Sequence, residues 1–329
     1  MRPALATCVF LGLLLAQPTS TTRAAELNAA AINAAEPSKA TLSNQKATAA
    51  GIRLQVLLDR AHFSPGEIDG KFGENARKAL RAFEAAQQLP GSDDVSGELW
   101  NKLATDGSPV TTNYTITAKD VAGPFLSKLP AKMEDMKDIP KLSYTSAREE
   151  LAERFHMSEG LLVALNPGQH FERAGEKIVV IDTGTDQSPQ KAARVEVDKT
   201  EQTVKLFDSA NALLAFYPAT VGSAEKPSPS GTLKVTEIDR NPTYRYNPAY
   251  HFKGVKSRKP FVIKPGPNNP VGDVWINLSG EGYGIHGTPY PEKVSKSESH
   301  GCVRLTNWDA ERVAERVAKG TPVVFVDDR

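Results

Sequence analysis

SHGCVRL at residues 299–305, together with HGT at residues 286–288, is the part of this sequence with the clearest chemical meaning. It places Cys302 directly after a glycine, with a histidine in each stretch. A thiol is an effective nucleophile only as its thiolate, and a neighbouring imidazole commonly generates that thiolate near neutral pH. Gly301 has no side chain, so backbone N–H groups beside it could approach a substrate carbonyl and stabilise an oxyanion. The pattern therefore indicates a catalytic thiol.

The positions of the two histidines suggest how an imidazole reaches this thiol. If the backbone before Cys302 is extended, the side chains of His300 and Cys302 lie on the same face of the strand. His286 ends another expected strand, and a hairpin-like return would bring it to the thiol. One imidazole would then accept the thiol proton and later donate it to the leaving amine. The group that orients this imidazole is left open between a backbone carbonyl near Gly287 and a side chain.

The combined pattern resembles the signature of the L,D-transpeptidases of bacterial cell-wall synthesis, the YkuD-type catalytic domain. The resemblance covers residues 192–328, and it implies that Cys302 is the nucleophile and His286 the general base and acid. It also implies that His300, Gly301 and Cys302 shape the oxyanion site, mainly through backbone N–H groups.

The same resemblance gives roles to further residues around the two stretches. Ser299 and Gly287 would support the catalytic loop, and Thr288 would bind substrate. Arg304 is expected either to hold a substrate carboxylate or to form a structural ion pair. Two more segments resemble the β core and a loop over the cleft in this family, namely residues 228–232 and 240–244.

Two other roles for Cys302, and one non-catalytic role for the whole chain, compete with the catalytic interpretation. With His300 and His286 it would make a Cys-His-His zinc site, although no Cys-x-x-Cys or His-Glu-x-x-His spacing accompanies it. It would be a buried inert thiol in an apolar core, but the flanking His-Gly and Arg304 disfavour that environment. The chain would also be a non-catalytic wall-binding scaffold that kept the fold, a possibility that the presence of both His286 and Cys302 disfavours.

The start of the chain is typical of a secretory signal peptide over residues 1–24. Arg2 precedes an apolar run at residues 4–16, which is too short to span a bilayer, and small residues at 22–24 offer a cleavage point. Cys8 lies inside this leader, so Cys302 would be the one cysteine of the mature protein. We therefore expect an exported, periplasmic protein without a membrane span in its mature chain.

Composition restricts the class of protein further. The 329 residues leave room for several domains, and a formal net charge of +1 without any basic block gives no indication of nucleic-acid binding. Residues 25–48 are rich in small and polar residues and are expected to be a flexible linker. Residues 49–106 show helical spacing of apolar residues around a DGKFG turn at 69–73. They resemble the three-helix peptidoglycan-binding domain.

Residues 113–183 have an expected order of strand, helix, helix and strand. This order resembles a LysM module, with the Leu165-Asn166-Pro167 stretch as a matching piece. A segment at residues 118–142, containing three prolines, interrupts the pattern as an insertion. Glycan binding and a purely structural packing role are both open for this module.

The region from residue 192 onward is dominated by short strands that alternate apolar and polar residues, with a single late helix. Thr306 is expected to cap that helix, with Asp309 completing a capping box, and Gly320 to follow its end. The expected fold class is therefore multidomain. It has a small all-α three-helix domain, a small α+β LysM-like module, and a mainly-β catalytic domain with one late helix.

The family resemblance implies a two-step acyl transfer that needs no metal and no organic cofactor. Cys302 would attack the third residue of a tetrapeptide stem and expel D-alanine, giving a thioester. The acceptor would be an amine of a second stem, giving a 3–3 cross-link, or an outer-membrane protein anchored to the wall. Water as acceptor would make an L,D-carboxypeptidase instead. The expected partners are peptidoglycan stem peptides and glycan, and the expected role is in cell-wall biogenesis and cell shape.

Overall fold

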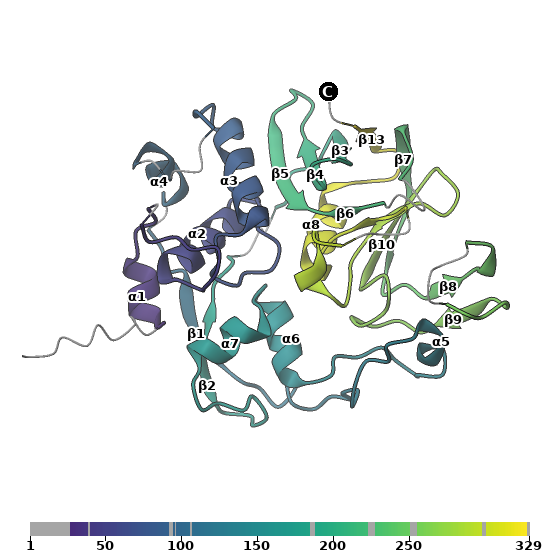
Figure 1. Cartoon of the computed structure of the whole chain (residues 1–329), viewed down its shortest axis with the longest axis horizontal. Coiled ribbons are helices and arrows are strands. Elements are labelled where there is room, and N and C mark those ends of the chain that lie inside the picture. Colours follow the sequence, from purple (N-terminus) through teal and green to yellow (C-terminus); the bar gives the residue numbers. More distant parts are fainter. Residues whose placement is uncertain are drawn as a thin grey trace, which may run out of the picture.

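The structure is a computed structural model that describes residues 27–38, 40–91, 95, 97–105, 107–184, 188–222, 228–250, 255–297 and 301–327. The expected leader with Cys8, and two residues of the catalytic stretch, Ser299 and His300, lie outside the described residues. A helical part and a β part lie side by side, and the segment with the short helix α5 (Met133–Met136) passes beneath them (Figure 1).

The helical part begins with four helices: α1 (Ala29–Ala34), α2 (Ala49–Arg60), α3 (Glu74–Ala86) and α4 (Gly97–Leu103). The Thr48 hydroxyl accepts the Gly51 N–H and so begins α2, as expected of a polar N-cap. Gly51 and Gly70 touch, because a Cβ on Gly51 would lie 2.2 Å from the Gly70 carbonyl oxygen. This close approach folds the 69–73 turn back onto the start of α2.

The described part of residues 25–48 differs from the flexible linker that we expected. It contains helix α1, whose Ile32 is fully buried. The Asn33 side chain accepts the Val110 N–H at 2.8 Å and donates to the Thr111 hydroxyl at 2.8 Å. A single buried isoleucine and one well-placed amide therefore order a segment whose average composition resembles a linker.

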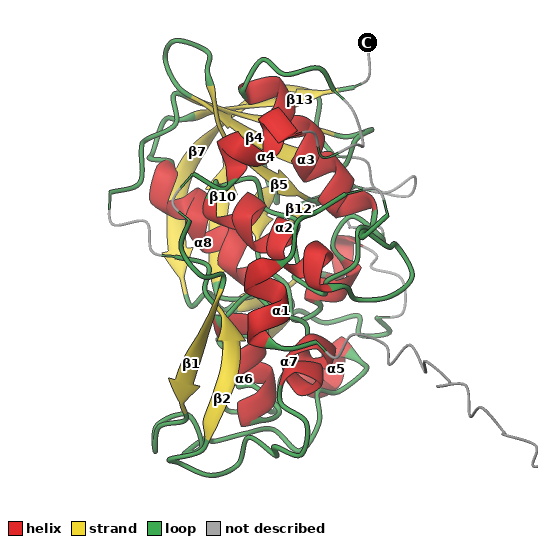
Figure 2. Cartoon of the chain, turned by 90° about the vertical axis from the view of Figure 1, so that its left-hand side faces the viewer, coloured by secondary structure: helices red, strands yellow, loops and turns green. Residues whose placement is uncertain are grey.

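The next module has the expected order of elements: β1 (Thr111–Thr115), α6 (Ala147–Arg154), α7 (Glu159–Leu165) and β2 (Lys177–Ile181). Strands β1 and β2 pair antiparallel. Asn166 joins α7 to β2, because its side chain donates to the Leu162 and Val179 carbonyls and accepts the Val179 N–H. This module and the four helices share one hydrophobic core, so they form a continuous body (Figure 2).

A nine-stranded sheet, in the order β5-β4-β3-β13-β7-β10-β11-β12-β6, forms the β part. Its strands in chain order are β3 (Arg194–Asp198), β4 (Thr203–Phe207), β5 (Leu213–Pro218), β6 (Thr220–Val221), β7 (Gly231–Arg240), β10 (Val274–Leu278), β11 (Gly284–His286), β12 (Val303–Arg304) and β13 (Pro322–Val326). The long strand β7 pairs with β13 through its first half and with β10 through its second. This makes the sheet continuous from β5 to the catalytic strands.

One face of this sheet is covered by α8 (Asn307–Arg316), which the Thr306 hydroxyl caps by accepting the Asp309 N–H. Apolar side chains from the sheet and from α8 form a second core, which includes Ile276, Ile285 and Val313. A separate antiparallel pair, β8 (Tyr244–Tyr246) and β9 (Phe261–Ile263), stands outside the main sheet. Single 3-10 turns lie at Pro248–Tyr250 and Pro291–Lys293.

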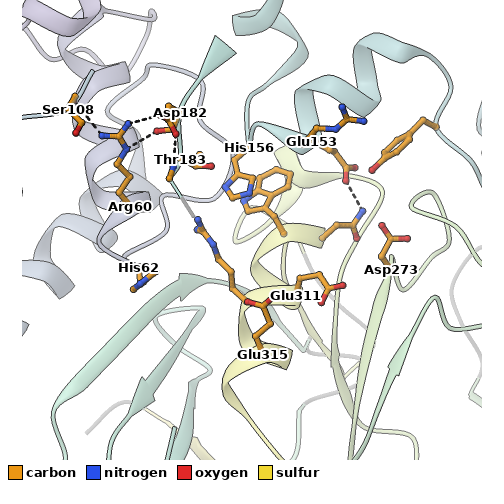
Figure 3. Close-up of a pocket in the computed structure, with 16 residues that line it drawn as sticks. Arg60, His62, Ser108, Glu153, His156, Asp182, Thr183, Asp273, Glu311 and Glu315 are labelled. Carbon is orange, nitrogen blue, oxygen red and sulfur yellow. Dashed lines mark hydrogen bonds and ion pairs between the residues drawn. The ribbon is translucent and has the colours of Figure 1, made fainter. Parts of the chain in front are cut away.

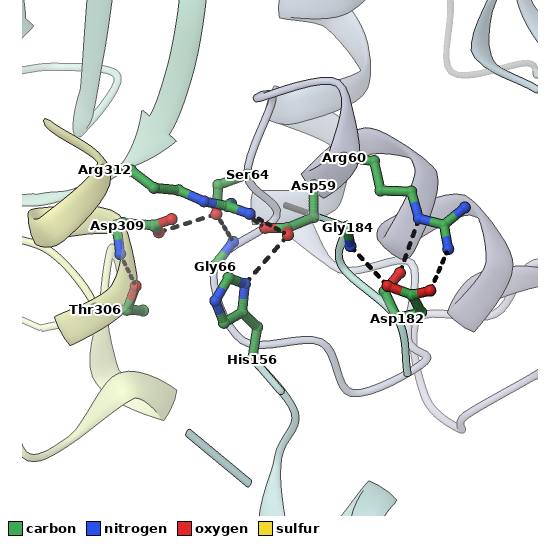
Figure 4. Close-up of polar contacts among 10 residues, drawn as sticks. All are labelled: Asp59, Arg60, Ser64, Gly66, His156, Asp182, Gly184, Thr306, Asp309 and Arg312. Carbon is green, nitrogen blue, oxygen red and sulfur yellow. Dashed lines mark hydrogen bonds and ion pairs between the residues drawn. The ribbon is translucent and has the colours of Figure 1, made fainter. Parts of the chain in front are cut away.

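The helical part docks on the β part through an edge strand and a buried polar network. Ser64 N–H donates to the Phe216 carbonyl, and Phe216 N–H donates to the His62 carbonyl, so the chain after α2 covers the exposed edge of β5. Beside it, Arg312 of α8 donates to both carboxylate oxygens of Asp59 at 2.7 and 2.9 Å (Figure 4). The three regions of the chain therefore meet in one interface. In the described ranges, every helix is too short or too polar to cross a bilayer.

Candidate active site

His286 lies at the end of β11, in the middle of a row of side chains that crosses the sheet. It pairs with Trp275 on β10 and with Arg304 on β12, and Trp275 pairs in turn with Asp239 on β7. Paired residues on neighbouring strands project to the same face, so these side chains form one wall. The expected hairpin return to the thiol is wrong, because β11 and β12 run parallel and a longer connection joins them.

The His286 ring is held in one orientation. Its Nδ1 lies 2.6 Å from the Gly287 carbonyl oxygen, and its ring stacks on Trp275 with 5.4 Å between centroids. A carbonyl only accepts, so in the neutral ring Nδ1 carries the proton and Nε2 keeps its lone pair. Of the two orienting groups that the sequence left open, the structure provides the backbone carbonyl of Gly287.

The same surroundings keep this imidazole neutral. Burial is the main cause that lowers the His286 pKa, the Arg304 charge lowers it further, and the hydrogen bond to Gly287 opposes them, with a result of about 3. Only 4% of the residue is exposed. A neutral ring with a free Nε2 lone pair can accept a proton at physiological pH, which is what a general base requires.

Cys302 is half-buried and stands directly before β12. Its Sγ lies 3.5 Å from the Gly282 carbonyl oxygen, a distance suited to a weak S–H donor. The preceding Gly301 has φ of 94°, a conformation that residues with a Cβ rarely adopt, and its carbonyl accepts the buried Ser228 hydroxyl at 2.9 Å. The glycine of the stretch is therefore needed to present the thiol from a tight turn.

A cavity of about 660 Å³ contains both Cys302 and His286 in its lining. Its walls are formed by residues of β7 and β10, by the chain leading into β8, and by Met133 from the segment with α5. The lining residues include Glu237, Asp239, Asn241, Thr243, Tyr244, Arg245, Trp275, Asn277, Gly282 and Arg304. The predicted nucleophile and the predicted base thus share one cleft.

Arg304 and Thr288, the two residues expected to contact substrate, differ in position. Arg304 lines the cavity next to His286. Burial lowers its pKa, and the neighbouring Cys302 and Tyr244 oppose that shift. Thr288 is 1% exposed, does not line the cavity, and accepts the Tyr290 N–H through its hydroxyl. The geometry therefore favours a substrate role for Arg304 and a structural one for Thr288.

Gly287 is fixed by contacts on its far side. A Cβ at this position would lie 2.2 Å from Asn307 Oδ1, and one on the adjacent Gly272 would lie 2.0 Å from the same atom. Asn307, at the start of α8, therefore packs directly against the loop whose carbonyl orients His286. This contact supports the expected role of Gly287, and nothing in the sequence pointed to Asn307.

Several cleft residues were missed by reasoning from the sequence. Trp275 and Asn277 occupy alternate positions of β10 and face the cleft, and the alternation of residues 274–278 already indicated a two-sided strand. Met133 could not be found in this way, because only the folded chain brings it to the cleft. Within the described residues, no group of three His, Cys, Asp or Glu side chains is arranged to hold a metal ion.

A second cavity, of about 840 Å³, lies where the three regions meet (Figure 3). Arg60 and Asp182 pair at one end, Glu153 accepts from the Asn307 side chain at the other, and His156 stacks on Trp308 between them. Burial raises the Glu153 pKa well above its usual range, although the hydrogen bond from Asn307 opposes the shift. The lining of this cavity contains no cysteine, whereas the smaller cleft contains both Cys302 and His286, so the smaller cleft is the better active-site candidate.

Comparisons with known proteins identify the family of the domain that contains Cys302 and His286. A family model described as the L,D-transpeptidase catalytic domain, YkuD, matches residues 192–325. A second model, of a peptidoglycan binding domain, matches residues 51–103. The LysM-like assignment of residues 113–183 stays a prediction.

Proteins that carry the L,D-transpeptidase name are similar to this chain. The L,D-transpeptidase-family protein YqjB of Bacillus subtilis is 30% identical over 135 residues, which is 40% of this chain and 68% of YqjB. YbiS of Escherichia coli K12, of the same family, is 27% identical over 256 residues, covering 76% of each chain. L,D-transpeptidase 3 from Mycobacterium tuberculosis is 17% identical, with a TM-score of 0.34 over 47% of this chain and 70% of that one. This chain belongs to the L,D-transpeptidase family and carries its YkuD-type catalytic domain.

Proposed function

We propose that this protein is a peptidoglycan L,D-transpeptidase with Cys302 as nucleophile and His286 as general base and acid. The observation that supports the proposal is that both residues line one cleft, with the His286 tautomer fixed by the Gly287 carbonyl. Because Nδ1 is engaged, Nε2 is the atom that exchanges protons with the reacting groups. The low pKa of His286 keeps that atom unprotonated until the thiol proton reaches it.

The reaction consists of two acyl transfers. In the first, Cys302 Sγ gives its proton to His286 Nε2 and forms a bond to the carbonyl carbon of the third stem residue, diaminopimelate. The bond from that carbon to the nitrogen of the terminal D-alanine breaks, and the amine leaves with the proton from His286. In the second, an acceptor amine gives its proton to His286 and replaces the sulfur. The thiolate leaves and is reprotonated.

The oxyanion of each tetrahedral intermediate needs hydrogen-bond donors. We assign this role to backbone N–H groups at His300, Gly301 and Cys302, with Ser299 supporting the loop. The left-handed Gly301 and its anchored carbonyl support a fixed backbone at this point. Arg304, a partly buried cation in the cleft wall, is assigned to a substrate carboxylate.

The other parts of the chain are proposed to place this chemistry at the cell wall. Residues 49–106 would bind peptidoglycan, and residues 113–183 would bind glycan if they are a functional LysM module. The leader at residues 1–24 would direct the chain to the periplasm. The acceptor is an amine of a second stem, which gives a 3–3 cross-link, or an amine of an outer-membrane protein. Transfer to water would give carboxypeptidase activity at the same site.

The proposal is tested by mass spectrometry. Exposure of the intact protein to a carbapenem is expected to add one acyl group to wild type and none to Cys302→Ala. Incubation with disaccharide-tetrapeptide is expected to give dimers, trimmed tripeptide or D-alanine exchange, all lost in Cys302→Ala and strongly reduced in His286→Ala. An adduct that survives Cys302→Ala, or turnover that survives it, refutes catalysis at this residue. The relative amounts of dimer and tripeptide identify the acceptor.

A further inference from the structure

Residues 118–142, here named the insert, interrupt the second module and do not remain within it. The chain leaves that module after β1, and its short helix α5 (Met133–Met136) lies beside β8 and β9 of the catalytic part (Figure 1). It then returns through Leu142 to the start of α6. The proline-containing segment therefore joins a module at one end of the molecule to the active-site region at the other.

An apolar cluster, separate from both main cores, holds the insert against the β8–β9 hairpin. It combines residues from these two segments, which are Leu126, Leu129, Met133, Met136, Ile139 and Leu142 from the insert and Tyr244, Phe261 and Ile263 from the hairpin. A two-stranded hairpin by itself is at best marginally stable in water. The insert thus supplies the apolar surface on which this hairpin packs.

Polar contacts fix the same two segments in register. The Glu134 carboxylate accepts the backbone N–H groups of Lys256 and Ser257, which precede β9. Leu142 N–H donates to the Pro265 carbonyl at 2.9 Å. Gly266 has φ of 142°, and a Cβ there would lie 2.3 Å from the Leu142 carbonyl oxygen. This close backbone contact leaves little freedom for the insert to slide along the catalytic part.

The hairpin that the insert supports is part of the cleft wall. Thr243, Tyr244 and Arg245 line the cavity that contains Cys302 and His286. Met133 lines it as well, and all the other lining residues of the described chain belong to residues 237–304. One side chain from outside the catalytic region therefore faces the space that substrate would occupy.

We propose that the insert is a specificity-determining element of the transpeptidase cleft. It holds the β8–β9 hairpin in place, and Met133 contacts the part of a stem peptide that lies away from the attacked carbonyl. This inference rests on the proposed function. The ligand class is an extended peptide that carries carboxylates and an aliphatic side chain, because the cleft offers the guanidinium of Arg245 together with the apolar thioether of Met133.

Binding without turnover tests the contact directly. In a Cys302→Ala background, Met133→Ala is expected to raise the Kd for disaccharide-tetrapeptide about tenfold, as for the loss of a partly buried methionine contact. Met133→Leu keeps an apolar side chain of similar volume and is expected to stay within about twofold of the parent. Val163→Ala, an exposed apolar residue on α7 of the same module, is the matched control and is expected to leave Kd unchanged. An unchanged Kd in Met133→Ala, or an equal loss in Met133→Leu, overturns the proposal.

Comparing the kinetics of two reagents distinguishes a loss of stem-peptide recognition from damage to the reacting groups. With Cys302 present, Met133→Ala is expected to reduce kcat/KM for the stem peptide at least fivefold more than it reduces the rate of carbapenem acylation. Equal losses for both reagents overturn the specificity role. Absence of any carbapenem adduct on wild type would refute the proposed function but not the role of Met133 in binding, because the Kd comparison does not depend on turnover.

The supporting role of the insert is tested by hydrogen exchange. Glu134→Ala removes the acceptor for two backbone N–H groups and is expected to speed exchange in residues 244–246 and 261–263 about tenfold. Exchange in α8 serves as the internal control and is expected to stay unchanged. Unaltered exchange in the hairpin would show that it does not depend on the insert.

Discussion

The buried pair of Asp59 and Arg312 offers the sharpest test of how the regions of this chain are joined. Asp59, at the end of α2, has a fully buried side chain, and Arg312 on α8 donates to both of its oxygens. His156, from the second module, lies 3.1 Å from the same carboxylate. Burial raises the Asp59 pKa, but the charge of Arg312 and the contact with His156 outweigh it and hold the pKa well below its usual range.

Arg312→Met removes the cation and keeps an apolar stem of similar length. The Asp59 carboxylate would then be buried without its main partner, which costs about 3–5 kcal/mol of unfolding free energy for a buried ion pair broken at one end. Domain stabilities are commonly about 5–15 kcal/mol, and the loss falls on the interface and not on the core of either part. We therefore expect the two parts to separate before either of them unfolds. Calorimetry of wild type should give one main transition, and the variant should give two.

The control for this experiment is an exposed ion pair made to the same helix. Arg240 pairs with Glu311 of α8 where both side chains are exposed, so Arg240→Met is expected to cost at most about 1 kcal/mol. The double variant Asp59→Asn with Arg312→Met removes both charges and should recover most of the loss. If Arg312→Met costs no more than Arg240→Met, the pair does not hold the interface and the reasoning fails.

The dependence of the stability difference on pH gives a further test of this pair. Because the folded pKa of Asp59 is depressed, its contribution to stability is present above its unfolded pKa near 3.9 and is lost as pH falls through the folded value. The stability difference between wild type and Arg312→Met should therefore shrink on acidification, first as His156, relieved of the Arg312 charge in the variant, gains a proton beside Asp59, and then as Asp59 itself is protonated. A difference that grows on acidification would contradict an ionised, paired Asp59.

Three further predictions concern the cleft and the second module. Gly287→Ala places a Cβ 2.2 Å from Asn307 Oδ1, so we expect overpacking to lower the unfolding free energy by about 1–3 kcal/mol. The carbonyl that orients His286 must then shift, so the rate of carbapenem acylation should fall about 100-fold at fixed temperature. The His286 pKa of about 3 predicts that its neutral form persists on acidification. The rate of carbapenem acylation should therefore fall much less between pH 7 and 5 than the roughly 30-fold expected for an ordinary imidazole. A fall in rate with a midpoint near pH 6.5 would contradict this prediction. Asn166→Ala removes two hydrogen bonds to Val179 of β2 and one to Leu162 of α7, and should cost about 2–4 kcal/mol in denaturant unfolding, with carbapenem acylation of Cys302 retained.

Local features of the fold were predictable from the sequence because they depend on neighbouring residues. The alternation of apolar and polar residues placed a strand at 274–278, which is β10. Thr306 was identified as the cap of the late helix, and its hydroxyl does accept the Asp309 N–H. The order of strand, helix, helix and strand in the second module is confirmed as well. In each case the side chain and its backbone partner are only a few residues apart.

The arrangement of the strands was beyond such reasoning. The parallel pairing of β11 with β12 depends on β6 and β10 occupying the flanking positions, and no local pattern encodes this order. His156 gave no signal of its own in the sequence, yet it is largely shielded from solvent, lies against Asp59 and stacks on Trp308. Its environment is made by residues from all three regions of the chain.

The insert shows why dividing this chain into independent modules is insufficient for the active site. Its prolines and polar residues gave it the composition of a connection, while in the described chain its apolar residues at 126, 129, 133, 136, 139 and 142 form one cluster with the hairpin. The hairpin strands have three residues each, so the insert supplies most of the apolar residues of this cluster. Each segment therefore depends on the other for stability. The buried Asp59–Arg312 pair in turn joins α2 of the helical part to α8, whose apolar face packs in the core of the nine-stranded sheet. The shape of the substrate site is thus a property of the whole chain, although the reacting groups belong to one domain.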